Sequence, residues 1–233
     1  MTLWKKLTLT IAKINNKQNF FLLTPLFGIL IFIFLYFVAS LYYPGGSNVD
    51  KTTPGFDWLN NYWCDLTGQL AKNGEINSAQ PIALIAMLIL CSSLWVFWYY
   101  LPRLFSANKF NSIIRYTGIT SMTVAIFLFT SLHDVVINIA GTFGIAALTG
   151  VFIGLYKNKL TKLFGFGVLC LGLMLFNYFI YQTNFLIPLL PLIQKTTFFL
   201  FLLWVCLLDV YLYKTINEKK SNEQLMQESQ DII

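Results

Sequence analysis

A few polar side chains lie at the ends of long apolar runs, where charged residues are otherwise scarce. They are Asp65, Asn77, His133, Asp134, Asn138 and Lys195. Asp and Lys side chains can pair with each other, and the single histidine titrates near neutral pH. A charge at membrane depth costs about 2.5–3.5 kcal/mol, so such groups usually pair or carry out a function. We therefore expect these side chains to converge on one candidate site.

Three of these residues are candidates for catalysis, and the same residues are candidates for a structural role. In the catalytic interpretation, His133 is a general base, and Asp65 or Asp134 orients it or holds a metal ion. In the structural interpretation, Lys195 pairs with one of these carboxylates and fastens a loop, or extends from a helix end to water. No Walker, GxGxxG, GxSxG or HExxH motif occurs, and the sequence assigns no cofactor and no metal.

The elements that must position these residues are membrane-spanning helices. Of 233 residues 57% are hydrophobic and 11% charged, whereas soluble domains are about a quarter charged. This composition excludes an ordinary water-soluble domain and a disordered chain. About 20 consecutive apolar residues cross a bilayer as a helix. The sequence predicts an all-α integral membrane protein with a six-transmembrane-helix bundle, with spans at residues 20–42, 81–101, 113–132, 135–156, 163–182 and 192–213.

The basic residues predict the orientation of these spans. Most of the 16 lysine and arginine residues lie in the N-terminal tail (1–19), in the second-to-third and fourth-to-fifth connections, and in the C-terminal tail (214–233). Because basic residues favour the cytoplasmic side, we expect a multi-pass protein of the inner (plasma) membrane with both termini cytoplasmic. The polar segment from Glu218 to Ile233 is expected to be flexible. The net charge of +6 follows from this orientation and needs no nucleic acid as a partner.

One long connection, residues 43–80, is expected on the extracytoplasmic side. Connections longer than about 12–15 residues are usually functional or disordered, and this one is too rich in aromatic residues for disorder. The segment from Gly55 to Asp65 is expected to form a short interfacial helix. Asn77 or Ser78 is expected to cap the next helix.

Two features inside the expected bundle are interpreted as structural. Asp209 lies near the cytoplasmic end of the last predicted helix, where we expect an ion pair with a basic residue. Gly150 and Gly154 form a GxxxG pair, for which packing within the bundle is favoured and homodimerisation stays open. The Phe- and Leu-rich first and sixth predicted helices are expected to face lipid. For Asp209, the candidate partners in the expected ion pair are Arg103, Arg115 and Lys214.

Several short segments resemble a known family. They are NNYWCDL, NGEIN ahead of the second predicted helix, the lone histidine at the end of the third, and QK opening the Trp-containing last helix. In these segments the chain resembles the bacterial six-span membrane proteins grouped as domain of unknown function 998, over about residues 20–213. The resemblance implies the six-helix fold but no reaction. It also implies a ligand-binding set made of Asn61, Asp65, Asn77, His133 and Lys195.

A weaker similarity links FDWLNNYWCD and NGEINSAQP to the first loop of the alkaline ceramidases, in the CREST group of membrane hydrolases. Those enzymes hold zinc with an aspartate and several histidines. The similarity implies a metal-dependent lipid hydrolase in which Asp65, His133 and Asp134 take part. The late histidine pair of those enzymes is absent here, because the last predicted helix has no histidine.

We therefore predict a membrane protein of unknown biochemical activity whose polar extracytoplasmic pocket binds a lipid-like or amphipathic ligand, with the long loop as a lid. Two alternatives stay open: a membrane-embedded metal-dependent lipid hydrolase, and a structural or assembly subunit. The expected partners are membrane lipids and either a second copy of the chain or another membrane protein. A transporter is disfavoured because the apolar runs lack repeated acidic residues.

Overall fold

The computed structural model describes residues 21–105, 109–128 and 132–230. Within these ranges the chain forms helices and no β-strand, which confirms the predicted all-α class there. The four 3₁₀ helices are η1 (Phe21–Leu23), η2 (Trp63–Thr67), η3 (Leu101–Leu104) and η4 (Ile187–Leu189). The α-helices are α2 (Thr24–Leu41), α3 (Gln80–Tyr100), α4 (Lys109–Ala125), α5 (His133–Lys157), α6 (Thr161–Thr183) and α7 (Leu190–Gln230).

Five helical segments among the described residues are long and apolar enough to cross a membrane, as in a multi-pass membrane protein. They are Phe21–Leu41, Gln80–Leu104, Val135–Lys157, Thr161–Thr183 and Ile187–Glu223. The predicted third span, residues 113–132, does not appear among them. Its helix, α4, has 17 residues and ends at Ala125, and residues 129–131 of that prediction lie outside the described ranges.

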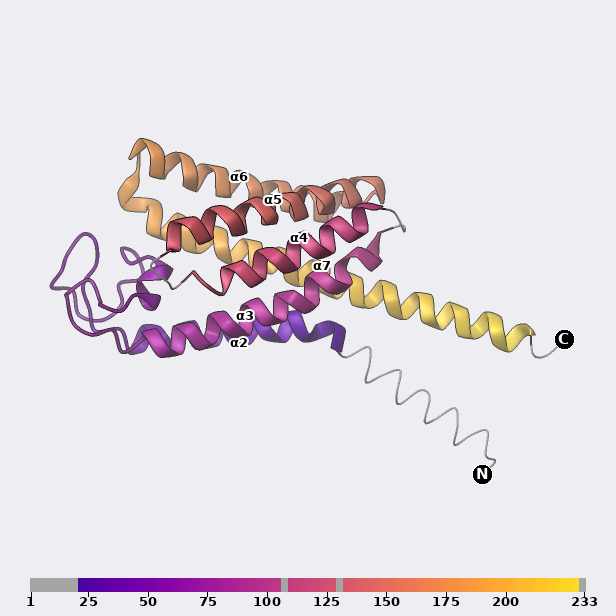
Figure 1. The fold of residues 1–233 in the computed structure, drawn as a ribbon, viewed down its shortest axis with the longest axis horizontal. Coiled ribbons are helices and arrows are strands. Elements are labelled where there is room, and N and C mark those ends of the chain that lie inside the picture. Colours follow the sequence, from indigo (N-terminus) through magenta and orange to yellow (C-terminus); the bar gives the residue numbers. More distant parts are fainter. Residues whose placement is uncertain (1–20, 106–108, 129–131, 231–233) are drawn as a thin grey trace, which may run out of the picture.

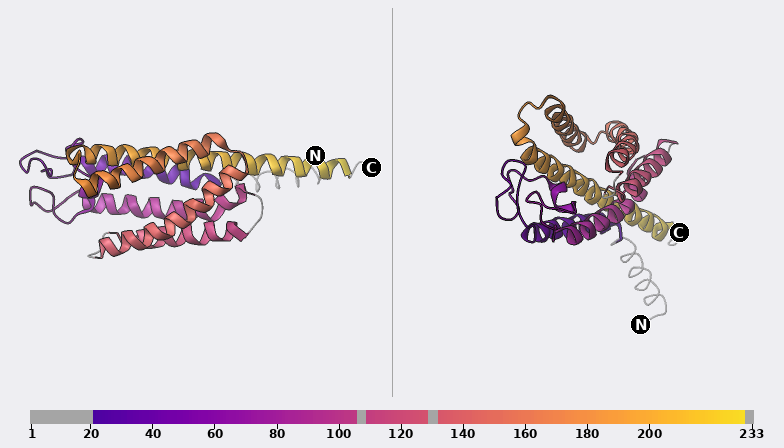
Figure 2. Two further views of the ribbon diagram at one scale, coloured as in Figure 1. Left: turned by 90° about the horizontal axis from the view of Figure 1, so that it is seen from above. Right: turned by 60° about the vertical axis from the view of Figure 1, so that its left-hand side comes forward.

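The helices α2 to α7 run back and forth along one long axis (Figures 1 and 2). The connections α2–α3, α4–α5 and α6–α7 lie at one end of the bundle, which we call the loop end. The connections α3–α4 and α5–α6 lie at the other, which we call the opposite end. This alternation brings the segments that carry the predicted site residues to the loop end.

The apolar core is continuous through the bundle, and the helices contribute to it unequally. About 17% of the apolar span of α6 is buried inside the protein, against 39% for that of α7. The helix that faces its surroundings most is therefore α6. The last helix, α7, packs against α2, α6 and η3, so less of it is open to its surroundings than of α6.

The GxxxG pair of α5 is used for packing inside the chain. A Cβ atom on Gly150 would lie 2.4 Å from the side chain of Ile114 in α4. One on Gly154 would lie 2.7 Å from the ring of Phe105, which follows η3. These distances are too short for any side chain, so glycine allows the close approach. The favoured interpretation, packing within the bundle, is confirmed.

The last helix continues well past the predicted end of its span. α7 has 41 residues and projects from the opposite end of the bundle (Figure 1). We expected a flexible tail from Glu218 onward, but residues 218–230 continue the helix. The physical reason is that the chain has neither glycine nor proline after Pro191, so nothing interrupts a helix rich in Glu, Lys, Gln and Met.

Candidate functional site

The long connection, residues 42–79, is folded by side-chain hydrogen bonds more than by regular secondary structure. Asp57 Oδ1 accepts a hydrogen bond from the Leu59 amide (2.9 Å), and Asn61 Oδ1 accepts one from the Asp57 amide (2.9 Å). Such bonds compete with helical hydrogen bonding. Turns therefore replace most of the interfacial helix expected over Gly55–Asp65, and the helical turn η2 comes later, at Trp63–Thr67.

Five polar residues of this end form a connected group, the polar cluster: Asn61, Asp65, Lys72, Asn77 and Lys195. Asn61 lies at its centre and is fully buried, with 0% of its surface exposed. Its Nδ2 group donates to the Gly46 carbonyl (3.0 Å) and to Asp65 Oδ2 (3.0 Å). Asn61 thus joins two distant parts of the loop.

Asp65 is buried, and both of its carboxylate oxygens have partners. Oδ2 accepts hydrogen bonds from the Tyr62 amide (2.9 Å) and from Asn61, and Oδ1 pairs with Lys72 Nζ at 3.3 Å. A carboxylate bonded in this way to its own loop has little capacity left for a metal ion or for orienting a base. The contacts favour the structural interpretation of Asp65.

Lys195 connects α7 to the loop. Its Nζ group donates to the Asn61 carbonyl and lies 5.9 Å from the centre of the Phe56 ring. The carboxylates of Asp57 and Asp65 attract it electrostatically. We expected Lys195 to pair with an aspartate, and among the described residues the direct partner of Asp65 is Lys72 instead.

Asn77 joins η2 to the start of α3. Its Nδ2 group donates to the carbonyls of Asp65 (3.1 Å), Leu66 (3.2 Å) and Gly68 (2.8 Å). Its Oδ1 accepts from the Ala79 amide (3.1 Å), one residue before α3 begins. The prediction that Asn77 or Ser78 caps this helix is wrong, because Ala79 is the N-cap residue of α3 and no side chain caps the helix. The Asn77 side chain instead forms a turn just ahead of α3 and holds the end of η2.

The remaining predicted residues lie on α5. His133 and Asp134 begin this helix at the loop end, but their side chains lie outside what the structure describes. Asn138 is exposed on the next turn. The catalytic set of His133, Asp65 and Asp134 therefore stays a prediction. Among the described side chains, no group of three or more His, Cys, Asp or Glu residues gathers closely enough to hold a metal ion.

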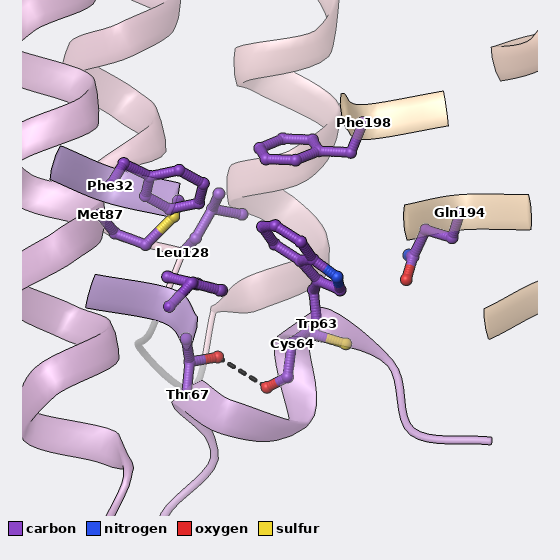
Figure 3. A pocket seen from close by; sticks show the side chains of 9 residues that line it. Phe32, Trp63, Cys64, Thr67, Met87, Leu128, Gln194 and Phe198 are labelled. Carbon is purple, nitrogen blue, oxygen red and sulfur yellow. Dashed lines mark hydrogen bonds between the residues drawn. The ribbon is translucent and has the colours of Figure 1, made fainter. Parts of the chain in front are cut away.

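Beside the polar cluster lies a pocket of about 260 Å³, drawn in Figure 3. It opens between the loop, α2, α3 and α7, and aromatic, aliphatic and sulfur-containing side chains make up most of its wall. The residues that line it are Phe32, Tyr36, Trp63, Cys64, Thr67, Met87, Leu128, Gln194 and Phe198.

Aromatic packing fixes one wall of this pocket. The Trp63 ring stacks on Tyr36 with ring centres 5.0 Å apart, and lies 5.8 Å from Phe32 and 5.4 Å from Phe198. Such ring pairs contribute about 0.5–1.5 kcal/mol each beyond the area they bury. The indole of the loop is thereby held between α2 and α7, as Figure 3 shows.

Two polar atoms of the pocket wall are buried without a hydrogen-bond partner among the described residues. They are Nε1 of Trp63 and Oε1 of Gln194. Leaving a buried polar group unbonded costs about 1–3 kcal/mol, so such groups need an explanation. The sequence analysis did not single out either residue. The available signal was a glutamine beside Lys195 in an otherwise apolar run.

Cys64 lies at the mouth of the same pocket. Desolvation, and after it the nearby Asp65 carboxylate, raise the pKa of the Cys64 thiol to about 11. The thiolate is the reactive form of cysteine, so this thiol is a poor nucleophile near neutral pH.

Asp209 shows a different environment at the opposite end. Its side chain is fully buried, with 0% of its surface exposed, and neither oxygen has a hydrogen-bond partner among the described residues. The backbone amide of Leu26, in the first turn of α2, favours the charged form of this carboxylate. The expected ion pair is absent, because Arg103 and Arg115 instead lie over the rings of Tyr100 and Tyr99.

Comparison of the chain with protein-family models, curated proteins and solved structures found no match. The resemblances to the domain of unknown function 998 proteins and to the CREST hydrolases therefore stay hypotheses.

Proposed function

We propose that the chain is a six-span membrane protein that binds a lipid-like or amphipathic ligand in the pocket beside the long loop. The observation that carries the proposal is the pair of unpartnered polar atoms, Trp63 Nε1 and Gln194 Oε1, in an otherwise mainly apolar pocket. One atom donates a hydrogen bond and the other accepts one. A ligand hydroxyl or amide group can satisfy both.

The size and lining of the pocket favour one part of an amphipathic molecule. Its volume of about 260 Å³ lies below the roughly 300–1,000 Å³ of pockets for drug-sized molecules. The ring faces of Phe32, Tyr36 and Phe198 suit an apolar chain, and Gln194 suits a neutral polar end. Asp65 and Lys195 already have partners within the protein. We therefore propose that Trp63 and Gln194 make the polar contacts with the ligand in their place.

The membrane orientation belongs to the same proposal. α4 runs from the opposite end of the bundle toward the loop end, and its 17 residues extend about 25 Å at 1.5 Å per residue. We therefore count it as the sixth span. The basic residues then favour an extracytoplasmic loop end in the inner membrane, with both termini in the cytoplasm.

Ligand extraction with matched tryptophan substitutions tests the proposal. Met87 lines the pocket, and the next residue of α3, Leu88, is exposed on the outside. Met87→Trp fills the pocket, and Leu88→Trp adds the same side chain elsewhere. We expect an amphipathic molecule at about one per chain in solvent extracts of the wild type and of Leu88→Trp, and its loss from Met87→Trp.

Identical extracts from all three proteins, with Met87→Trp still folded, would contradict a ligand in this pocket. A second variant tests the polar contact. Gln194→Leu removes one hydrogen bond of about 1–1.5 kcal/mol, and should weaken binding of the extracted molecule about tenfold.

The alternative functions predict different results. The metal-dependent lipid hydrolase requires a stoichiometric metal ion that disappears in His133→Ala, together with turnover of lipid amides. The structural or assembly subunit requires a copurifying protein and no small ligand. Neither alternative has a supporting contact among the described residues.

A further inference from the structure

A second open groove lies between the first turn of α6 and α7. These parts of the two helices belong to the opposite end of the bundle, away from the loop (Figure 1). Its volume is about 480 Å³, and it opens between the first turn of α6, the turn before it, and α7. Three lysines line it: Lys159, Lys162 and Lys214. The pocket of the proposed function shares no residue with it.

The floor of this groove is a single apolar stripe on α7. Leu207, Val210 and Tyr211 lie three and four residues apart, and Lys214 follows at the next turn of the same face. Leu160 and Leu163 form the wall on the α6 side. The stripe therefore changes from apolar to cationic along the helix.

The three lysines have no negative partner in the described structure. All three side chains are exposed, and none makes an ion pair with a described residue. No acidic side chain lines the groove. The first turn of α6 also borders the groove. Its backbone amides have no acceptors within their own helix, so they favour a negative group nearby.

The groove lies where one membrane-spanning segment, α6, begins beside another, α7. α6 begins its span at Thr161, and the apolar stripe of α7 belongs to the span Ile187–Glu223. A phospholipid has the same order along its length, with acyl chains at depth and a phosphate at the surface. Three cations match a phosphate that carries a negative charge, and basic pockets between spanning helices are known to take such headgroups.

From these observations we propose that the groove lined by Lys159, Lys162 and Lys214 is a binding site for one anionic phospholipid. The phosphate contacts the lysines, and the acyl chains lie along Leu207, Val210 and Tyr211. The site goes beyond the proposed function, because it takes a different ligand at the other end of the bundle.

Native mass spectrometry of the delipidated protein tests this site, with phosphatidylglycerol and phosphatidylcholine of identical acyl chains as probes. The test variant carries Lys159→Gln, Lys162→Gln and Lys214→Gln. The matched control carries Lys51→Gln, Lys219→Gln and Lys220→Gln, which remove the same charge outside the groove. Each lysine near an anionic surface contributes a factor of about five, so the test variant should bind phosphatidylglycerol at least about tenfold more weakly.

Under conditions in which phosphatidylcholine has dissociated, the wild type and the control should each retain one phosphatidylglycerol molecule. A triple Lys→Arg variant should also retain it, which separates loss of charge from loss of fold. Equal binding by wild type and the Gln variant, or an equal loss in the control, would overturn the site. Displacement of the lipid by millimolar glycerol 3-phosphate would assign the groove to a free phosphate instead. Met87→Trp should leave this binding unchanged, so the two proposals fail independently.

Discussion

At the loop end, the carboxylate of Asp65 accepts hydrogen bonds from Asn61 and Tyr62 and pairs with Lys72. At the opposite end, the fully buried Asp209 has no hydrogen-bond partner on either oxygen among the described residues. The lysines differ in the same direction. Lys195 donates to a loop carbonyl, while the three lysines of the groove stand exposed without ion pairs.

This difference separates charges that hold the fold from charges that are available to a ligand. At the loop end, Asp65 pairs with Lys72 and Lys195 donates to a loop carbonyl, so these charges stabilise the loop. The binding capacity of that end lies beside them, in Trp63 and Gln194. At the opposite end, Lys159, Lys162 and Lys214 are exposed without an ion pair to a described residue, so a negative group can reach them. Each prediction below tests one side of this contrast.

The largest effect is expected for Asp65→Ala. The change leaves Lys72, the Tyr62 amide and the Asn61 side chain without their acceptor, and unpaired buried groups are costly. We expect the free energy of unfolding in detergent to fall by about 3 kcal/mol. Glu75→Ala, which removes an exposed carboxylate of the same loop, should change it by less than about 0.5 kcal/mol. An equal change in the free energy of unfolding for the two variants would contradict a structural role of Asp65.

Lys195→Met should have the next largest effect. The substitution keeps the apolar stem but removes the hydrogen bond from α7 to the Asn61 carbonyl. A lost bond from a charged donor costs about 1.5–3 kcal/mol, so we expect about 2 kcal/mol. Trypsin should also cut the loop faster, at Lys51. Lys214→Met at the opposite end should leave both measurements unchanged, and similar effects from both variants would erase the contrast between the two ends.

Asp209→Asn should change stability in the other direction. A buried carboxylate without partners is costly, and a neutral amide of nearly the same shape removes the charge. We expect the free energy of unfolding, measured by denaturation in detergent, to rise by about 1 kcal/mol. Asp50→Asn, on the exposed part of the loop, serves as the comparison. A loss of stability in Asp209→Asn would show that the carboxylate has a partner after all.

The smallest effect concerns reactivity and leaves stability unchanged. Burial raises the pKa of Cys64 from an ordinary 9.0 to about 11. The raised pKa keeps the thiol protonated at pH 8, so a maleimide should react about a hundredfold more slowly than with an ordinary thiol. The rate should rise about tenfold per pH unit from 7 to 10. A rate that levels off below pH 9 would contradict the desolvated environment, and the unfolded protein supplies the reference rate.

Hydropathy predicted most of the helices, because a span needs little beyond length and apolar composition. It predicted the α4 region least well, since Arg115 and several polar residues dilute that helix. It also missed the helical residues 214–230, where no apolar run marks a helix and only the absence of glycine and proline does.

The candidate site was predicted in part. The sequence indicated Asn61, Asp65, Asn77 and Lys195, and the fold brings these four together. It could not reveal that they satisfy one another, because that depends on how the loop folds back between α2 and α7. For the same reason it could not identify Trp63 and Gln194, which are far apart in sequence and meet only in the folded pocket.

The unbroken course of α7 has a mechanical consequence. At 1.5 Å per residue its 41 residues measure about 60 Å, roughly twice the 30 Å of a hydrocarbon layer. This one continuous helix carries Gln194 and Phe198 near its first end, and its other end projects from the bundle (Figure 2). Because a continuous helix twists as one body, any rotation imposed at Phe198 reaches the projecting end at nearly the same angle. A probe attached to the projecting end should therefore report a rotation of α7 at the pocket.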